Sequence, residues 1–272
     1  MTLEDAINAM AEPIVPTEST DLEVFYYLRD IVQIISDSEF GSKFILKGGT
    51  VLLSKLIEAD KLMYGRRTSD IDIHCSNRDV WNKFCDKFED LINSNTNKFS
   101  ISVINRRSDA KSDFMSDSIS FVLYSNDVTY RLKIDMNIKD DSLIVCNYSP
   151  ILNINTYDLL TSLSDKIVVV SSQKVYRRIK DLYDIAIIIG LTSFTYDDLI
   201  KYIDRKHHNV KLTNMLTQEN VTDLKHAYDK YSGIYNKPDF IFIFSIASDF
   251  LKPLYYNTEV TSWSCEAGSW VK

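Results

Sequence analysis

The stretch KFILKGGTVLLSKLIEA, residues 43–59, sets two adjacent glycines between an apolar segment and a second apolar segment with helical period. The whole chain has only seven glycines in 272 residues, so a pair at one point is a specific feature. Residues 43–46 are predicted to form a short strand and residues 50–59 a helix. A turn at Gly48 and Gly49 leaves unobstructed N–H groups at the beginning of that helix, where phosphates bind. A plain connecting turn is the alternative explanation.

A second stretch, SDIDIHC at residues 69–75, alternates polar and apolar residues, which is typical of a strand with one buried face. Asp70 and Asp72 are two residues apart, so both carboxylates leave the same face, with Cα atoms roughly 6.5 Å apart. Two like charges this close repel each other, and a bound Mg²⁺ would relieve the repulsion through the oxygen ligands that it prefers. A solvated outer face of the sheet is the alternative explanation for this spacing.

A third acid lies on the clearest strand of the sequence, residues 129–138. One face of this strand is apolar and the other is polar, with Arg131, Lys133, Asp135 and Asn137 on the polar face. If the strand neighbours residues 69–75, Asp135 joins the two other carboxylates beside the diglycine turn. Three carboxylates beside a phosphate-binding turn form the two-metal arrangement used for phosphoryl and nucleotidyl transfer. Taken alone, Asp135 has an ordinary surface acid as its alternative explanation.

Two later helical segments, residues 156–173 and 176–190, carry charge in an ordered way. Lys166 lies in an apolar stripe of the first, so it must extend to solvent or meet an anion; a triphosphate or an aspartate would serve. The second has a polar stripe at helical spacing, formed by Arg177, Lys180, Asp181 and Asp184. A plain amphipathic helix with surface ion pairs is the alternative, and we favour it for Arg177.

The remaining patterns predict a chain in two halves. Further strands are expected at 99–104 and 119–124, and further helices at 21–37 and 78–93. Beyond Pro150 helices dominate, at 156–173, 176–190, 196–207, 217–231 and 239–252. We therefore expect a mixed α/β half over residues 1–150 and an all-helical half over residues 151–272.

Composition limits the classes of function. No apolar run approaches the ~18 residues of a membrane helix, and the N-terminus has acids where a signal peptide needs bases, so we expect a cytoplasmic protein with no membrane partner. The four cysteines show no zinc-site spacing. The formal net charge is −7, but residues 166–211 carry nine Lys and Arg against five Asp and Glu. That local excess suits an anionic ligand or simply reflects solvated helix faces.

Taken together, these motifs resemble a known pattern. GGT at 48–50, RRTSDIDI at 66–73 and LKIDM at 132–136 are similar to the polymerase-β-like nucleotidyltransferases. More narrowly, together with DKIVVVSSQKVYRRIKDLYDI at 165–185, they resemble the AbiEii nucleotidyltransferase toxins of the bacterial AbiE abortive-infection toxin–antitoxin family. The order and spacing of the four motifs make the likeness more specific than any one of them. One departure is that an arginine at 67 stands where the family more often has an aromatic residue, so either Arg66 or Arg67 takes the family's role.

The resemblance implies an α+β fold, in which the mixed sheet and flanking helices of a polymerase-β-like nucleotidyltransferase are followed by a C-terminal helical bundle. It implies a transferase that uses Mg²⁺, at two metal sites, to move a nucleotide from an NTP to an acceptor. RNA, and tRNA in particular, is the expected acceptor, and the modification would halt growth in a type IV toxin–antitoxin system. The cognate antitoxin need not touch this protein.

The resemblance also implies roles for single residues in a cleft between the two halves. Asp70, Asp72 and Asp135 would bind Mg²⁺, and Asp135 would also help to deprotonate the attacking hydroxyl. Lys166 would be the fourth catalytic residue, neutralising charge on the transferring phosphate. The expected nucleotide-binding residues are Gly48, Gly49, Thr50, Arg67, Lys180, Asp181 and Asp184, with Lys180 and Asp184 orienting Lys166 or the nucleotide.

Two other functions fit the same motifs. A nucleotidyltransferase that modifies a small molecule, such as an antibiotic, would share the D-x-D motif and would leave label on a small hydroxyl compound instead of RNA. An inactive relative that senses nucleotides or binds proteins would share the fold. Because an inactive site would tolerate Asn or Ser at positions 70 and 72, the retained aspartates favour an enzyme.

Overall fold

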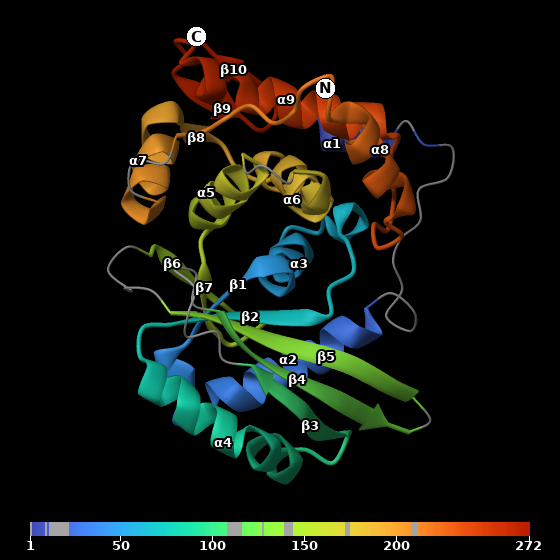
Figure 1. Ribbon diagram of the computed structural model, residues 1–272, viewed down its shortest axis with the longest axis vertical. Helices are drawn as coiled ribbons and strands as arrows, with labels where there is room; N and C mark the ends of the chain where they lie inside the picture. The colour runs from blue at the N-terminus through green and yellow to red at the C-terminus, as the bar shows by residue number, and fades with distance from the viewer. Residues whose placement is uncertain are drawn as a thin grey trace. The chain divides into compact units, whose positions relative to one another are not determined.

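The computed structural model describes residues 2–8, 10, 22–107, 116–126, 128–138, 144–171, 175–207 and 211–272. The chain forms two compact units (Figure 1). One, which we call the sheet unit, comprises Pro16–Glu58 and Arg67–Tyr157, and the other, the helical unit, comprises Met1–Val15, Ala59–Arg66 and Asp158–Lys272. The chain therefore leaves the sheet unit after Glu58 and returns to it at Arg67, directly before the D-x-D segment.

The sheet unit is built on a seven-stranded mixed sheet with the strand order β3-β4-β5-β2-β1-β7-β6. The strands are β1 (Ile45–Lys47), β2 (Asp70–Cys75), β3 (Ser100–Arg107), β4 (Ser116–Ser125), β5 (Val128–Ile138), β6 (Cys146–Ser149) and β7 (Ile154–Tyr157). β2 runs parallel to β5 and β1 runs parallel to β7, whereas the other neighbours are antiparallel. This mixed sheet with flanking helices confirms the predicted α+β class.

Helices α2 (Glu23–Ser36) and α4 (Arg78–Asn95) lie on one side of this sheet, and α3 (Gly48–Glu58) lies on the other (Figure 1). α4 begins where the side chain of Asn77 accepts hydrogen bonds from two backbone N–H groups of the first turn. Its apolar residues recur at helical spacing and are buried, and the Phe88 ring packs 5.2 Å from the Phe121 ring of β4. The buried core of the unit therefore lies between these two helices and one face of the sheet.

The helical unit contains α1 (Leu3–Asn8), α5 (Leu159–Val170), α6 (Ile179–Ile189), α7 (Tyr196–His207), α8 (Val221–Lys230) and α9 (Phe240–Tyr256), with short 3₁₀ turns η2 (Leu62–Tyr64) and η4 (Val175–Arg178). α6 is its central helix, because every side chain from Leu182 to Ile189 is buried. The structure thus confirms a mainly helical second half. None of the helices in the described part of the chain has the length and apolarity that crossing a membrane would need.

Two details of this half differ from the prediction. The helix expected from residue 156 begins at Leu159, because residues 154–157 form β7 and Asp158 caps the helix by accepting a hydrogen bond from the Thr161 N–H at 2.6 Å. The half also contains a small sheet, with strands β8 (Phe194–Thr195), β9 (Ser262–Ser264) and β10 (Ser269–Val271). Strands of two or three residues are too short for an alternating pattern to show in the sequence.

Candidate active site

The diglycine turn and the D-x-D strand are built around each other in the sheet unit. Gly48 is the first residue of α3 and has φ of +75°, a conformation that residues with a Cβ rarely adopt. A Cβ on Gly48 would lie 1.9 Å from Oδ2 of Asp72, so no side chain fits between this backbone and that carboxylate. Glycine is therefore required at position 48 both by the backbone angle and by the close approach of Asp72.

Thr50 holds the beginning of β2, the strand that carries Asp70 and Asp72. Its Oγ1 donates a hydrogen bond of 2.7 Å to the backbone carbonyl of Asp70, and the residue is buried. The first turn of α3 is thereby tied to β2 at the position of the first aspartate. The hydroxyl proton of Thr50 is thus used within the protein, and the predicted contact of Thr50 with a phosphate stays a prediction.

The three predicted metal-binding acids lie on one face of the sheet. In the parallel pairing of β2 with β5, Asp72 lies opposite Asp135 and Asp70 lies opposite Lys133. Residues directly opposite each other share a face, and so do residues two apart on one strand, so the three carboxylates leave the sheet on the same side. The Asp135 side chain is 30% exposed, and its Oδ1 lies 2.5 Å from the Nζ of Lys133.

These acids supply ligands of the right kind for magnesium, which takes carboxylate oxygens. Within the described residues, however, no three His, Cys, Asp or Glu side chains are gathered as a metal site. Asp135 instead faces Lys133, and Asp72 faces the backbone of Gly48. The donor set on this face therefore fits Mg²⁺ by its chemistry, while its carboxylates are directed to protein groups.

One cation of this face was not singled out by the sequence analysis. Lys47 lies opposite Asp72 in the antiparallel pairing of β1 with β2, so its side chain leaves the sheet on the same side as the acids. Its Nζ is 5.8 Å from the centre of the Tyr157 ring. Only the strand register shows this relation, because nothing in the sequence sets which residue of β1 is opposite Asp72.

The later motif forms a buried ion cluster inside the helical unit. Arg66 donates two hydrogen bonds to the Asp184 carboxylate, from Nε at 2.6 Å and from Nη2 at 2.8 Å. The Nζ of Lys166 lies 2.6 Å from Oδ1 of Asp181 and 2.8 Å from Oδ2 of Asp184. The Asp184 side chain is fully buried and the Arg66 side chain is 9% exposed, whereas the Lys166 and Asp181 side chains are 16% and 17% exposed. Two cations and two anions therefore compensate each other in a largely buried cluster.

The cluster changes how its members titrate. Burial by itself raises the pKa of Asp184, but Arg66 and Lys166 outweigh it and hold that pKa well below its usual value. Burial likewise lowers the pKa of Lys166, and the charges of Asp184 and Asp181 outweigh it, so the pKa of this lysine is raised. Lys166 and Asp184 are therefore both ionised at neutral pH.

The structure separates the residues of the predicted polar stripe. Asp181 and Asp184 pair with Lys166 of α5, whereas Lys180 is exposed, with its Nζ 5.5 Å from the centre of the Tyr231 ring. Arg177 is exposed, as the preferred interpretation of that residue expects.

The structure also distinguishes the two neighbouring arginines. Arg66 is the buried one and belongs to the ion cluster, whereas Arg67 is exposed and begins the next segment of the sheet unit. The sequence left open which arginine takes the family's role. The structure shows that Arg66 pairs with Asp184, and the assignment of that role stays a prediction. A role of Arg67 in nucleotide binding stays a prediction, as does the meeting of the sheet-unit acids with Lys166 in one cleft.

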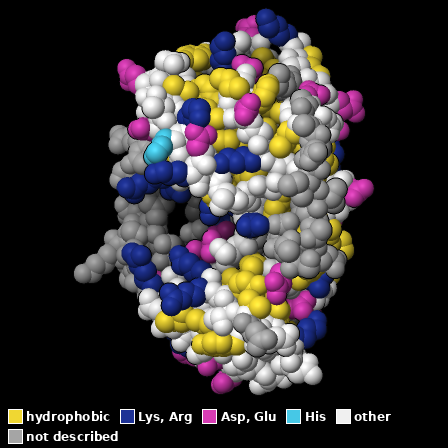
Figure 2. Space-filling view, turned by 90° about the vertical axis from the view of Figure 1, so that its right-hand side faces the viewer, with side chains coloured by type: hydrophobic (Ala, Val, Ile, Leu, Met, Phe, Trp, Pro, Cys, Tyr) yellow, Lys and Arg dark blue, Asp and Glu magenta, His cyan; other side chains and the backbone are white. Residues whose placement is uncertain are grey.

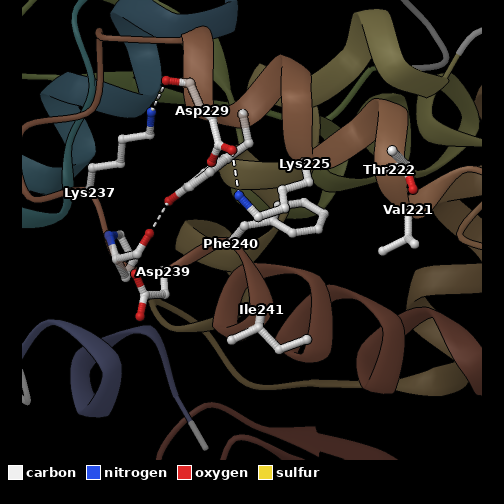
Figure 3. Close-up of a pocket in the computed structure, with 10 residues that line it drawn as sticks. Val221, Thr222, Lys225, Asp229, Lys237, Asp239, Phe240 and Ile241 are labelled. Atoms are coloured by element: carbon white, nitrogen blue, oxygen red, sulfur yellow. Dashed lines mark hydrogen bonds and ion pairs between the residues drawn. The ribbon is translucent and has the colours of Figure 1, made fainter.

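A pocket of about 550 Å³ lies in the helical unit, between α8 and the beginning of α9 (Figure 3). Lys225 pairs with Asp229 at 2.5 Å, and Lys237 donates a hydrogen bond of 3.0 Å to the backbone carbonyl of Asp229. The hydroxyl of Tyr228 donates to the carbonyl of Pro238 at 2.7 Å. The lining of this pocket contains none of the predicted site residues, and most of its polar groups are paired with one another.

Comparison with known families decides the assignment. Residues 29–237 match the model of a family described as "Nucleotidyl transferase AbiEii toxin, Type IV TA system". The chain belongs to the AbiEii family. The matched segment includes the diglycine turn, the D-x-D strand, Asp135 and the Lys166 cluster, so this AbiEii chain is a nucleotidyltransferase. The predicted family and enzyme class are therefore confirmed.

Similar solved structures include three proteins. JHP933 from Helicobacter pylori has a TM-score of 0.49 and 12% identity, covering 89% of this AbiEii chain and 96% of that chain. An antigenic nucleotidyltransferase-like protein from Paracoccidioides brasiliensis has a TM-score of 0.36 and 14% identity, covering 82% and 97%. The Megavirus polyadenylate synthase has a TM-score of 0.38 and 8% identity, covering 95% of this chain and 47% of that one. No curated protein matches the sequence, so the assignment rests on the family model.

Proposed function

We propose that this AbiEii chain is a Mg²⁺-dependent toxin that transfers a nucleotide from an NTP to RNA, with tRNA as the acceptor. The observation that carries the proposal is the register of β2 and β5, which sets Asp72 opposite Asp135 while the Asp72 carboxylate lies against the turn at Gly48. Acidic oxygens for a metal and helix N–H groups for phosphates are thus adjacent in one unit, as nucleotidyl transfer requires.

The beginning of α3 is the proposed phosphate site. Its first N–H groups, near Gly48, Gly49 and Thr50, have no acceptors within the helix, and the helix dipole adds positive potential there. A triphosphate placed at this end lies beside Asp72, so the acids need a cation between them and the phosphate. When bound, Mg²⁺ would neutralise phosphate charge and favour the ionised form of the attacking hydroxyl.

The residues of this chain divide the remaining work. The acceptor hydroxyl forms its bond to the α-phosphorus while the bond to pyrophosphate breaks, and Asp135 is the carboxylate that we assign to receive the hydroxyl proton. Lys166 is assigned to neutralise charge on the transferring phosphate. Asp184 acts through Lys166 and Arg66, by fixing their positions with its two oxygens.

The family description names a type IV toxin–antitoxin system, which supports the proposal of a cognate antitoxin. We propose that the toxin acts in abortive infection and that the antitoxin counteracts it without a required contact. Growth arrest caused by the toxin alone, and relieved when the neighbouring gene is expressed with it, would support this part of the proposal.

The decisive test compares wild type with Asp72→Ala. The wild-type chain is expected to arrest growth and to add label from an α-labelled NTP to tRNA, and the Asp72→Ala chain is expected to lose about 10³-fold in transfer rate because a metal ligand is gone. Asp90→Ala, at an exposed acid of α4, is the matched control and keeps full activity. Normal growth and unmodified tRNA 3′ ends with wild type would contradict the proposal.

A further inference from the structure

The face of the sheet that carries the acids continues across β5, β4 and β3 to the sheet edge. The paired residues on this face are Asp135 with Ser118, Lys133 with Ser120, Arg131 with Val122, and Thr129 with Tyr124, and β3 adds Ser102 and Ser100 opposite Val122 and Tyr124. The opposite face of the same strands is apolar and buried, with Ile119, Phe121, Leu123, Leu132 and Ile134. Within the sheet unit, α2 and α4 therefore cover only the apolar face.

With distance from the acids, the side chains on the polar face change from acidic to basic and aromatic. Next to Asp135 it holds Lys133, whose side chain is 43% exposed, and beyond it Arg131 and Tyr124. Tyr124 is 47% exposed, and the exposed Arg131 side chain has no ion pair or hydrogen bond with any described residue. Arg131 is four residues from Asp135 on β5, roughly 13 Å at 3.3 Å per residue.

These side chains suit a single-stranded nucleic acid. An exposed aromatic ring offers a surface for a base to stack on, and a guanidinium that has no ion pair among the described residues offers a phosphate contact. The whole chain has a formal net charge of −7, so an RNA strand needs a locally positive surface to approach the acids. In Figure 2, Lys and Arg side chains lie among hydrophobic ones in the lower part of the picture, which contains the sheet unit.

We propose that Tyr124, Arg131 and Lys133, which we call the acceptor face, bind the single-stranded 3′ end of the RNA acceptor. A base close to the end stacks on Tyr124, Arg131 binds the following phosphate, and the terminal hydroxyl reaches Asp135. The RNA thus runs along β5 from its beginning at Val128 toward the acids. This inference rests on the proposed function, because it requires that the acceptor be RNA.

Binding of a short fluorescein-labelled RNA with a free 3′ hydroxyl, followed by fluorescence anisotropy, tests the acceptor face on the full chain. Tyr124→Ala and Arg131→Gln are each expected to weaken RNA binding about tenfold. Arg131→Gln should also reduce the slope of log affinity against log salt concentration by about one, the amount expected for one lost phosphate contact. The matched controls are Tyr148→Ala, an exposed tyrosine at the other sheet edge, and Arg106→Gln, whose arginine pairs with Asp86. Both controls are expected to bind RNA like wild type.

The same chains separate this inference from the proposed function. Nucleotide transfer at saturating RNA should be near normal in Tyr124→Ala and Arg131→Gln, with a raised KM for RNA, whereas Asp72→Ala should bind RNA normally and lose about 10³-fold in transfer rate. Unchanged RNA affinity in both acceptor-face variants, or an equal loss in the controls, would overturn the acceptor face and leave the enzyme standing. If the acceptor-face variants bind RNA more weakly but the wild-type protein transfers no nucleotide to RNA, the proposed function alone would be overturned.

Discussion

The sheet unit and the helical unit each hold a set of charged side chains, but the two sets use their charge differently. On the sheet face, the three acids are partly exposed, and Asp72 is directed at a glycine backbone. In the helical unit, Asp184 is fully buried and both of its oxygens are bound by Arg66. The comparison teaches that the charge of the first set is partly open to solvent on one face of the sheet, whereas much of the charge in the second is used to hold side chains in place.

The largest effect on stability is expected from Asp184→Ala. This change leaves Arg66 and Lys166 buried next to each other with one counter-ion missing, which costs about 3–5 kcal/mol in the free energy of unfolding. Urea unfolding followed by circular dichroism measures the loss. Asp181→Ala is the matched variant and should lose less, because the Asp181 side chain is 17% exposed.

A double variant sharpens this first prediction. Arg66→Met with Asp184→Leu removes the buried pair together, so it should be more stable than Asp184→Ala alone. Equal stability of wild type and Asp184→Ala would show that the cluster is not buried in solution, and the contrast with the sheet face would fail.

Gly48→Ala should damage the sheet-unit site more than the fold. The positive φ at Gly48 costs a residue with a Cβ about 1–2 kcal/mol, and the Cβ displaces the Asp72 carboxylate, so transfer should fall at least about tenfold. Gly190→Ala is the control, because Gly190 has a negative φ and a Cβ there would lie at an ordinary 3.4 Å from its nearest neighbour, the Ile187 carbonyl oxygen. Full transfer activity in Gly48→Ala would show that Asp72 does not need its place against the turn.

Part of the pH dependence of stability should come from Asp184 in the helical unit. Because the folded pKa of Asp184 lies below its unfolded value of about 3.9, its contribution is complete above that pH and is lost as the pH falls toward the folded pKa. Unfolding free energies measured between about pH 5 and pH 2 should therefore fall more steeply for wild type than for Asp184→Asn. Parallel curves would contradict the assigned ion pairs.

Thr50→Val is expected to have the smallest effect. It removes the hydrogen bond from Thr50 to the Asp70 carbonyl, worth about 1 kcal/mol, and should lower transfer a few-fold by loosening the beginning of β2. Thr50→Ser keeps the hydroxyl and should behave like wild type in both respects. If the two variants are equally active and equally stable, the tie between α3 and β2 has no role in the site.

The sequence predicted five of the seven strands of the sheet unit because their patterns are local, and it missed the short strands β6 and β7. Alternation over residues 69–75 and 129–138 gave β2 and β5 nearly to their ends, and the diglycine marked the beginning of α3. What it did not determine is which strands are neighbours, since pairing joins residues far apart in the chain. The position of Lys47 opposite Asp72 follows only from that pairing.

The helical-unit cluster shows the same limit from the other side. Helical spacing predicted that Lys166 lies in an apolar stripe and must extend to solvent or meet an anion, and the structure pairs it with two aspartates. Arg66 has its partner 118 residues away, so neither its burial nor its distinction from Arg67 was visible in the local pattern. The sequence therefore predicted some members of the ion cluster, but not which of them contact one another.

The most direct test of the three-aspartate site is a crystal structure of the chain with Mn²⁺ and a non-hydrolysable NTP analogue, with Mn²⁺ located by its anomalous scattering. The ion is expected between Asp72 and Asp135, with Asp70 beside it, Lys133 released from Asp135, and the phosphates at the N–H groups of Gly48 and Gly49. An ion bound elsewhere, with Lys133 still paired to Asp135 and the phosphates away from α3, would contradict the assignment of this face as the catalytic site.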